Sequence, residues 1–122
     1  YEIVFADLVR GNYQSDSDLL FTVSNDAWFG DSIGPLQHMQ IARMRALELQ
    51  RPLVRVTNNG VSAVYDPLSH TQQTMPQFEA ATMKADIKLI QGDSVYSQYG
   101  NVFVWGFVLL LGVGGFGVRF RK

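Results

Sequence analysis

Residues 34–57 read GPLQHMQIARMRALELQRPLVRVT, and this stretch decides the fold. The Gly-Pro pair at 34–35 predicts the start of a helix, because proline is favoured at the first helical position. Four apolar side chains then recur at spacings of three and four: Met39, Ala42, Ala46 and Leu49. Such spacing places them on one face, turned toward a core. Pro52 ends the helix, since the residue before a proline disfavours helical backbone. Residues 53–57 then predict a strand.

The flanking residues predict a sheet beside this helix. Residues 19–24 (LLFTVS) are a short apolar run bounded by acidic residues, which indicates a buried strand. Residues 58–60 (NNG) tolerate positive φ, so we expect a tight hairpin into a further strand at 61–65. Residues 79–89 alternate loosely and predict another strand. Strand, helix and three more strands give a layered α/β domain.

Composition limits the possible functions. The 122 residues allow one domain, and a net charge of −1 argues against a nucleic-acid binder. The chain has no cysteine, so it offers no disulfide and no thiol nucleophile of its own. His38 and His70 lack the spacing of metal ligands, and we predict neither a metal nor a cofactor. The sequence starts at Tyr1 rather than Met, so we expect a segment of a longer protein.

An uncharged, apolar stretch lies near the C-terminus. Residues 102–118 read VFVWGFVLLLGVGGFGV, and 17 residues is the lower limit for a helix that crosses a hydrocarbon core of about 30 Å. A buried core helix is the alternative, but the five glycines at 106–117 would weaken a helix in water. Aromatic residues near 102 and cations after 118 fit a membrane interface and a cytoplasmic tail. We therefore predict a transmembrane helix at 102–118.

Residues 25–30 (NDAWFG) follow directly after the strand predicted at 19–24, in the position where α/β proteins build their sites. Trp28 and Phe29 are adjacent large aromatic residues in a polar loop. Two interpretations remain open, because the two rings could cap the core or line an apolar pocket.

Ionic residues cluster on the predicted helix. Arg43 and Arg45 are two positions apart and cannot share a face, so we expect one of them to point inward and to need a buried partner. Arg45 and Glu48 are three positions apart and can form a pair.

Several blocks of the chain together resemble one family. By residue number they are Tyr1-Glu2, 24–30 (SNDAWFG), Gly34-Pro35, His38, 42–48 (ARMRALE), Arg51-Pro52, 57–60 (TNNG) and 96–101 (YSQYGN). These blocks resemble the C-terminal part of the bacterial apolipoprotein N-acyltransferases, a family of the nitrilase, or carbon-nitrogen hydrolase, superfamily. The resemblance extends over essentially the whole chain.

The resemblance implies the C-terminal part of a nitrilase-like αββα sandwich, followed by one transmembrane helix. It implies a multi-pass protein of the bacterial inner membrane, monomeric at full length, whose catalytic domain faces the periplasm. The implied organisation has four parts: a catalytic portion at 1–95, a juxtamembrane linker at 96–101, the helix at 102–118 and a basic cytoplasmic tail at 119–122.

The implied activity is acyl transfer from a phospholipid to the amino-terminal cysteine of a diacylated apolipoprotein. The family's active centre is Glu-Lys-Cys, with the nucleophile in a Cys-Tyr-Glu motif, and this chain starts at the Tyr of that motif. The implied partners are therefore this donor, this acceptor and the membrane, but no nucleic acid. Because the chain has no cysteine, we expect it to be inactive alone.

The resemblance also implies roles for four residues. The backbone N–H of Tyr1 would be an oxyanion donor, and Glu2 would be a buried carboxylate close to the site. Trp28 and Phe29 would line the entrance for the acyl chain or the lipoprotein. Two other functions remain open, a nitrilase-type amide hydrolase and a non-catalytic, membrane-tethered scaffold domain.

Overall fold

The computed structural model describes the backbone of residues 2–119 and the side chains of residues 2–113. Its elements are, in chain order, η1 (Glu2–Val4), α1 (Ala6–Asn12), β1 (Leu20–Ser24), η2 (Ala27–Phe29), α2 (Gly34–Leu49), β2 (Leu53–Thr57), β3 (Ala63–Asp66), β4 (Thr71–Thr74), α3 (Val95–Tyr99) and α4 (Val102–Arg119). This order confirms the predicted mixed α/β class.

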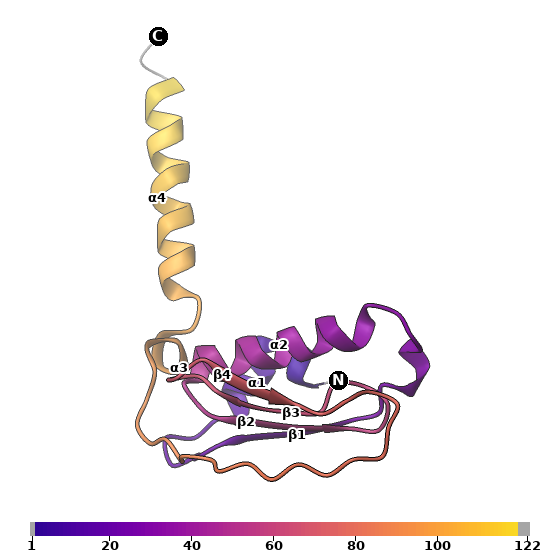
Figure 1. The fold of residues 1–122 in the computed structure, drawn as a ribbon. Coiled ribbons are helices and arrows are strands. Elements are labelled where there is room, and N and C mark those ends of the chain that lie inside the picture. Colours follow the sequence, from indigo (N-terminus) through magenta and orange to yellow (C-terminus); the bar gives the residue numbers. More distant parts are fainter. Residues whose placement is uncertain (1, 120–122) are drawn as a thin grey trace.

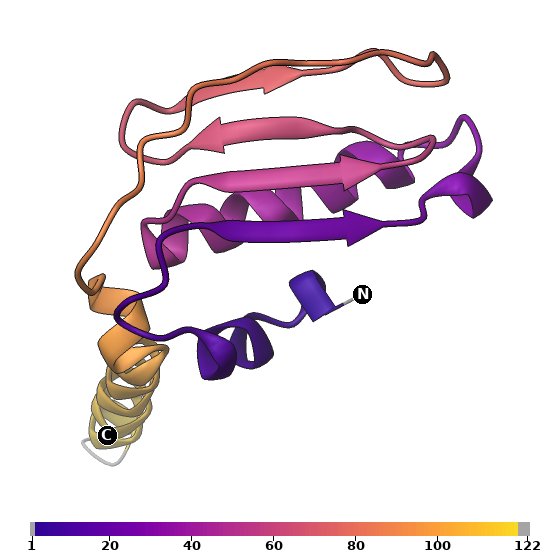
Figure 2. The ribbon, with the colours of Figure 1, turned by 90° about the horizontal axis from the view of Figure 1, so that it is seen from below.

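The four strands form one sheet in the order β1-β2-β3-β4 (Figure 1). β1 and β2 are parallel, and their register sets Leu20 opposite Leu53 and Ser24 opposite Thr57. The other two pairs are antiparallel. α2 joins the parallel strands and covers one face of the sheet, while η1 and α1 lie beside the edge of β1 (Figure 2). The C-terminal ends of β1 and β2 therefore meet at one edge of the domain.

The apolar stripe of α2 lies in the core, as predicted. Its members are at most 2% exposed: Met39, Ala42, Ala46 and Leu49. Leu53 and Tyr65 come from the facing side of the sheet and are fully buried. Removal of this apolar area from water is the main force that holds α2 on the sheet.

The ionic pair predicted on α2 is also present. Arg45 is the inward-pointing arginine, and its Nη2 donates to Glu48 Oε1 over 2.7 Å. Burial raises the pKa of Glu48, although the charge of Arg45 acts against this rise. The guanidinium of Arg43 instead lies over the ring of Tyr65, 4.9 Å from its centroid.

The strand predicted at 79–89 is wrong, because these residues form no strand. They run as irregular chain beneath the sheet, on the side away from α2 (Figure 1). Ile87 lies near Val64 and Gln73 of that lower face. A segment that passes under a face has its backbone groups out of the plane of the sheet, so it cannot extend the ladder.

One turn and one strand also differ from expectation. The connection between β2 and β3 is a hairpin of five residues, 58–62, rather than a tight turn, and no positive φ occurs at 58–60. Ser62 explains the longer loop, because its Oγ accepts the N–H of Thr57 over 2.9 Å. β4 had not been predicted, since its four side chains are all polar and exposed and give no apolar alternation.

The lower face of β1 and β2 is apolar and exposed. Phe21, Val23 and Val56 are 64%, 69% and 45% exposed, and they point away from α2 because strand side chains alternate. The predicted αββα sandwich would place a second sheet here. The described residues form a single sheet, so the sandwich remains a prediction.

α4 forms a helix over the predicted apolar stretch, and its side chains from Val102 to Val113 are all exposed. Within the described part of the chain, the length and apolarity needed to cross a membrane are not reached by any helix. The predicted span at 102–118 extends beyond the described side chains and remains a prediction. The predicted tail at 119–122 lies outside the residues with described side chains.

Candidate functional site

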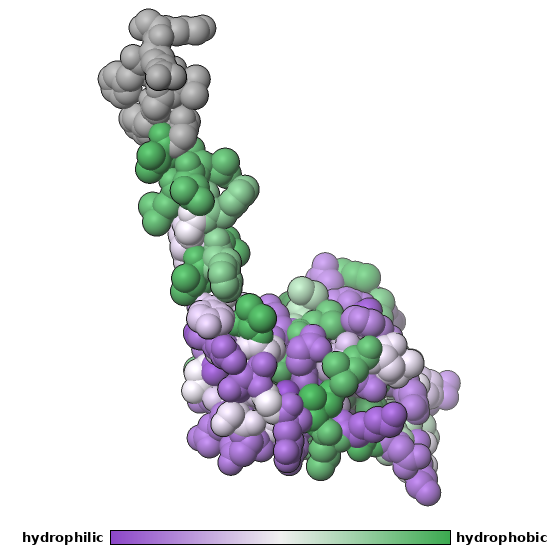
Figure 3. Space-filling view, turned by 90° about the vertical axis from the view of Figure 1, so that its left-hand side faces the viewer, coloured by the Kyte–Doolittle hydropathy of each residue, from purple (hydrophilic) through white to green (hydrophobic). Residues whose placement is uncertain are grey.

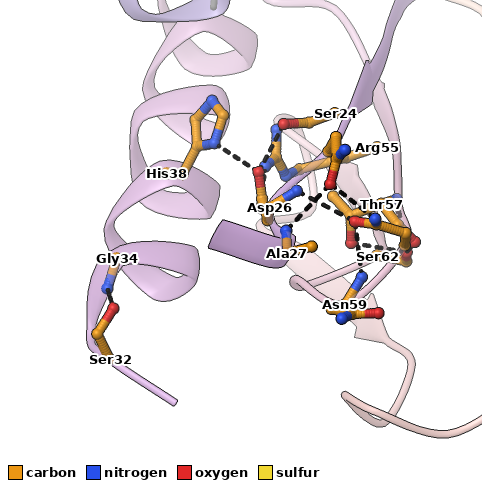
Figure 4. A network of polar contacts seen from close by, with 12 residues as sticks. Ser24, Asp26, Ala27, Ser32, Gly34, His38, Arg55, Thr57, Asn59 and Ser62 are labelled. Atoms are coloured by element: carbon orange, nitrogen blue, oxygen red, sulfur yellow. Dashed lines mark hydrogen bonds and ion pairs between the residues drawn. The ribbon is translucent and has the colours of Figure 1, made fainter. Parts of the chain in front are cut away.

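A buried polar network lies where the parallel strands end. Asp26 lies two residues after the end of β1 and is 1% exposed. Its carboxylate accepts three hydrogen bonds: from Ser24 Oγ to Oδ1 (2.6 Å), from His38 Nδ1 to Oδ1 (3.1 Å) and from Arg55 Nη2 to Oδ2 (2.8 Å). Figure 4 shows His38 approaching from α2 and Arg55 from β2. The carboxylate therefore links the sheet to the helix that covers it.

The protonation states in this network follow from its geometry. Burial alone would raise the pKa of Asp26, but the Ser24 hydroxyl, the charge of Arg55 and the contact with His38 outweigh it and hold that pKa below 3.8. Burial and the nearby charge of Arg55 lower the pKa of His38 below 6.5. A neutral His38 donates to an ionised carboxylate only if its proton is on Nδ1.

The loop after β2 closes the network from the other side. Asn58 Oδ1 accepts the backbone N–H of Asp26 over 3.1 Å, and Asn58 Nδ2 donates to Asn25 Oδ1 over 2.7 Å. Gly60 lies against the same carboxylate, since a Cβ at this position would be 2.7 Å from Asp26 Cβ. Real Cβ atoms do not approach that closely, so the site requires glycine here.

The adjacent aromatic residues of η2 take different positions. Trp28 is 74% exposed and does not cap the core. Phe29 is half-buried, and its ring is 6.3 Å from that of His38 in an edge-on arrangement. An open pocket of about 250 Å³ lies beside it, lined by Val4, Phe29, Gly34, Gln37, His38 and Ile41. The pocket interpretation therefore fits Phe29.

The two residues predicted as catalytic lie at the start of the chain. Tyr1 lies outside the described residues. Glu2 is exposed, so the expectation of a buried carboxylate is wrong for this chain. η1 explains the exposure, because it packs Ile3 against the core and leaves Glu2 facing outward, in a groove beside β1. Val4 of η1 does reach the pocket of Phe29, so the two predicted regions meet there.

No group of three or more side chains suited to a metal ion occurs among the residues that the structure describes. His38 is held by Asp26, and His70 is exposed with its Nδ1 3.2 Å from the hydroxyl of Tyr65.

Residues 1–95 match the family model described as carbon-nitrogen hydrolase. The chain belongs to the carbon-nitrogen hydrolase family. The match spans η1, the sheet and the Asp26 network, and it ends at the first residue of α3.

Relatives of this carbon-nitrogen hydrolase chain carry a more specific name. This chain is 53% identical over 107 residues to the apolipoprotein N-acyltransferase of Vibrio vulnificus, a match that covers 86% of this chain and 21% of that protein. It is 44% identical over 123 residues to the apolipoprotein N-acyltransferase of Pasteurella multocida, covering 100% of this chain and 24% of that protein. The chain thus spans about a fifth to a quarter of the length of these relatives.

Sequence reasoning missed the Asp26 network of this carbon-nitrogen hydrolase chain, although one signal was present. Arg55 is a cation at an inward position of the apolar run LVRVT. A buried cation needs a buried counter-charge, and Asp26 is the acid that directly follows the other apolar strand. The pairing could have been inferred once β1 and β2 were taken as neighbours.

Proposed function

We propose that this chain is the C-terminal region of an apolipoprotein N-acyltransferase of the bacterial inner membrane, with its α/β domain on the periplasmic face. The observation that carries the proposal is 44–53% identity to proteins of that name over most of the chain. The exposed aromatic and apolar residues near η2, which suit contact with lipid chains, support it.

The proposed reaction has two steps on one cysteine, which would directly precede Tyr1. The thiolate attacks the ester carbonyl of a phospholipid, a thioester forms, and the lysophospholipid leaves as its alkoxide, which takes up one proton. The α-amine of the amino-terminal cysteine of a diacylated apolipoprotein then attacks the thioester. An amide forms, and the thiolate is released together with one proton.

Roles follow for four residues of this chain. The backbone N–H of Tyr1 would stabilise the oxyanion of each tetrahedral intermediate, as preorganised donors do in acyl transfer. Glu2 would contribute a charge beside the reacting groups. Trp28 and Phe29 would contact the acyl chain where it enters. The Asp26 network would hold Phe29 and α2 in position behind this entrance.

The test uses the full-length protein in proteoliposomes, with an isotopically labelled phospholipid and a synthetic diacylated lipopeptide. We expect mass spectrometry to find one labelled acyl group in amide linkage on the amino-terminal cysteine of the lipopeptide. An amide hydrolase, which the family model also allows, would instead release ammonia from small amides. Ammonia release without acyl transfer would overturn the proposal.

A further inference from the structure

Arg10 joins α1 near the start of the chain to α3, the short helix that precedes α4. It lies on α1, and its guanidinium reaches α3, 86 positions further along. Its Nε donates to the carbonyls of Tyr96 (3.1 Å) and Ser97 (3.0 Å), and its Nη2 donates to that of Gln98 (3.1 Å). A guanidinium provides a planar set of donors for several acceptors at once, and a cation is favoured at a helix C-terminus.

Gly100 completes the contact with Arg10. Its φ is +54°, a conformation that favours glycine, and a Cβ there would be 3.0 Å from Arg10 Cζ. α4 begins two residues later, at Val102. The Arg10 contact therefore lies at the base of α4 (Figure 1).

Other contacts hold α3 on the domain. Ser94 Oγ donates to the carbonyl of Glu48 at the end of α2 over 2.6 Å. Tyr13 Oη donates to the carbonyl of Gly92 over 2.8 Å, and Arg51 donates to the same carbonyl. Residues of α1 and α2, and those shortly after them, thus hydrogen-bond to residues 92–98, the segment that precedes α4.

Among its described residues, α4 contacts the domain at its first turn, where the ring of Phe103 packs edge-on against that of Tyr99 in α3 at 5.6 Å between centroids. Its described side chains are all exposed, and Figure 3 shows an apolar column that stands clear of a largely polar body. The described contact of α4 with the domain is therefore made through α3. α1 is continuous with η1 on its other side, since the N–H of Phe5 bonds to the carbonyl of Glu2 over 3.0 Å.

We propose that Arg10 is a positioning residue that fixes the direction of α4 relative to the turn at Glu2. The proposal rests on the proposed function. If α4 enters the bilayer, Arg10 fixes how the turn at Glu2, beside the proposed nucleophile, faces the lipid surface. Arg10 touches no substrate. Its loss should impair reaction with donors that are held in a bilayer and spare reaction with donors in solution.

The kinetic test compares Arg10→Ala with wild type as full-length protein in proteoliposomes. Acyl transfer to the same lipopeptide is measured from bilayer phospholipid and from a short-chain, water-soluble acyl ester. We expect a loss of at least about tenfold with the bilayer donor and a change of less than about twofold with the soluble donor. Arg10→Lys should recover part of the loss, and Lys84→Ala, which removes an exposed cation elsewhere, should match wild type. Equal losses with both donors, or no loss, would overturn the proposal.

A distance measurement tests the role of the Arg10 contact independently of enzymatic activity. Met44 of α2 and Leu109 of α4, both exposed, are replaced by cysteine and carry nitroxide labels. All native cysteines of the full-length protein are replaced by serine. We expect one narrow distance distribution in wild type, and a broader one in Arg10→Ala and Gly100→Ala. An unchanged distribution in Arg10→Ala would overturn the proposal. If the wild-type protein is inactive with both donors, that result counts against the proposed function. The distance distributions then decide separately whether Arg10 fixes the direction of α4.

Discussion

Arg55 Nη2 and Asp26 Oδ2 lie 2.8 Å apart, and both side chains are completely buried. Arg55 Nε and Nη1 have no hydrogen-bond partner within the described part of the chain. Asp26 therefore compensates the positive charge at the point where β1, β2 and α2 meet.

Asp26→Asn should destabilise the full-length protein strongly. The substitution keeps the shape but leaves the Arg55 cation buried without its counter-charge, which typically costs about 3–5 kcal/mol. Thermal and denaturant unfolding measure the loss. Asp31→Asn, at an exposed acid of the same loop, is the matched control and should change the unfolding free energy by less than about 0.5 kcal/mol. Similar effects of the two substitutions would show that the ion pair is not a structural centre.

The same network should make the domain sensitive to acid. The pKa of His38 is lowered, so its contribution to stability is complete above pH 6.5 and is lost as the pH falls below that value. The pKa of Asp26 is lowered too, so its contribution is lost below pH 3.8. We expect His38→Gln to flatten the fall in unfolding free energy just below pH 6.5, and exposed His70→Gln to leave it unchanged. A wild-type stability that does not vary between pH 7 and pH 5 would contradict this expectation.

Gly60→Ala should also destabilise the protein, for a steric reason. The new Cβ would collide with Asp26 Cβ and Cγ, at 2.7 and 2.8 Å, and overpacking of this kind costs about 1–3 kcal/mol. Gly11→Ala provides a control of opposite sign, because nothing lies within 4 Å of its Cβ position on α1. Removal of a helical glycine there should stabilise by about 0.5–1 kcal/mol. If Gly60→Ala proves neutral in denaturant unfolding, the close approach is not a constraint.

Trp28→Ala should change donor preference and leave stability almost unchanged. The side chain is 74% exposed, so its removal opens no core cavity. If it contacts the acyl chain, its loss removes apolar contact worth about 1–3 kcal/mol with long-chain donors and little with short ones. Rates with long-chain and short-chain acyl esters measure the difference, and Trp28→Phe should recover part of it. Equal losses for both chain lengths would argue against a role in acyl binding.

The sequence predicted those elements whose signal is local. The 3-4-3 spacing from Met39 to Leu49 specifies a buried helix face regardless of its neighbours. β4 has no such signal, because its residues become a strand only by pairing with β3 after the turn at Asp66. Residues 79–89 show the opposite error, because a strand was predicted where none forms. Loose alternation does not supply the neighbouring strand that a strand needs for pairing.

The candidate site could be predicted only in pieces. The SNDAWFG loop, His38 and Arg55 each stood out in the sequence, but they meet because β1 and β2 are parallel and in the register that sets Ser24 opposite Thr57. Nothing local specifies that register. The outward position of Glu2 was missed for a related reason, since it depends on how η1 packs against α2.

The proposed function requires an acyl-enzyme on a cysteine that directly precedes Tyr1, and intact-mass spectrometry of the full-length protein tests for this species. The protein is incubated with phospholipid and without acceptor, then digested and mapped. We expect a mass gain of one acyl chain, located on the cysteine before Tyr1 and removed by hydroxylamine, which cleaves thioesters. An unmodified protein that still transfers acyl groups when acceptor is added, or an acyl group on any other residue, would contradict it.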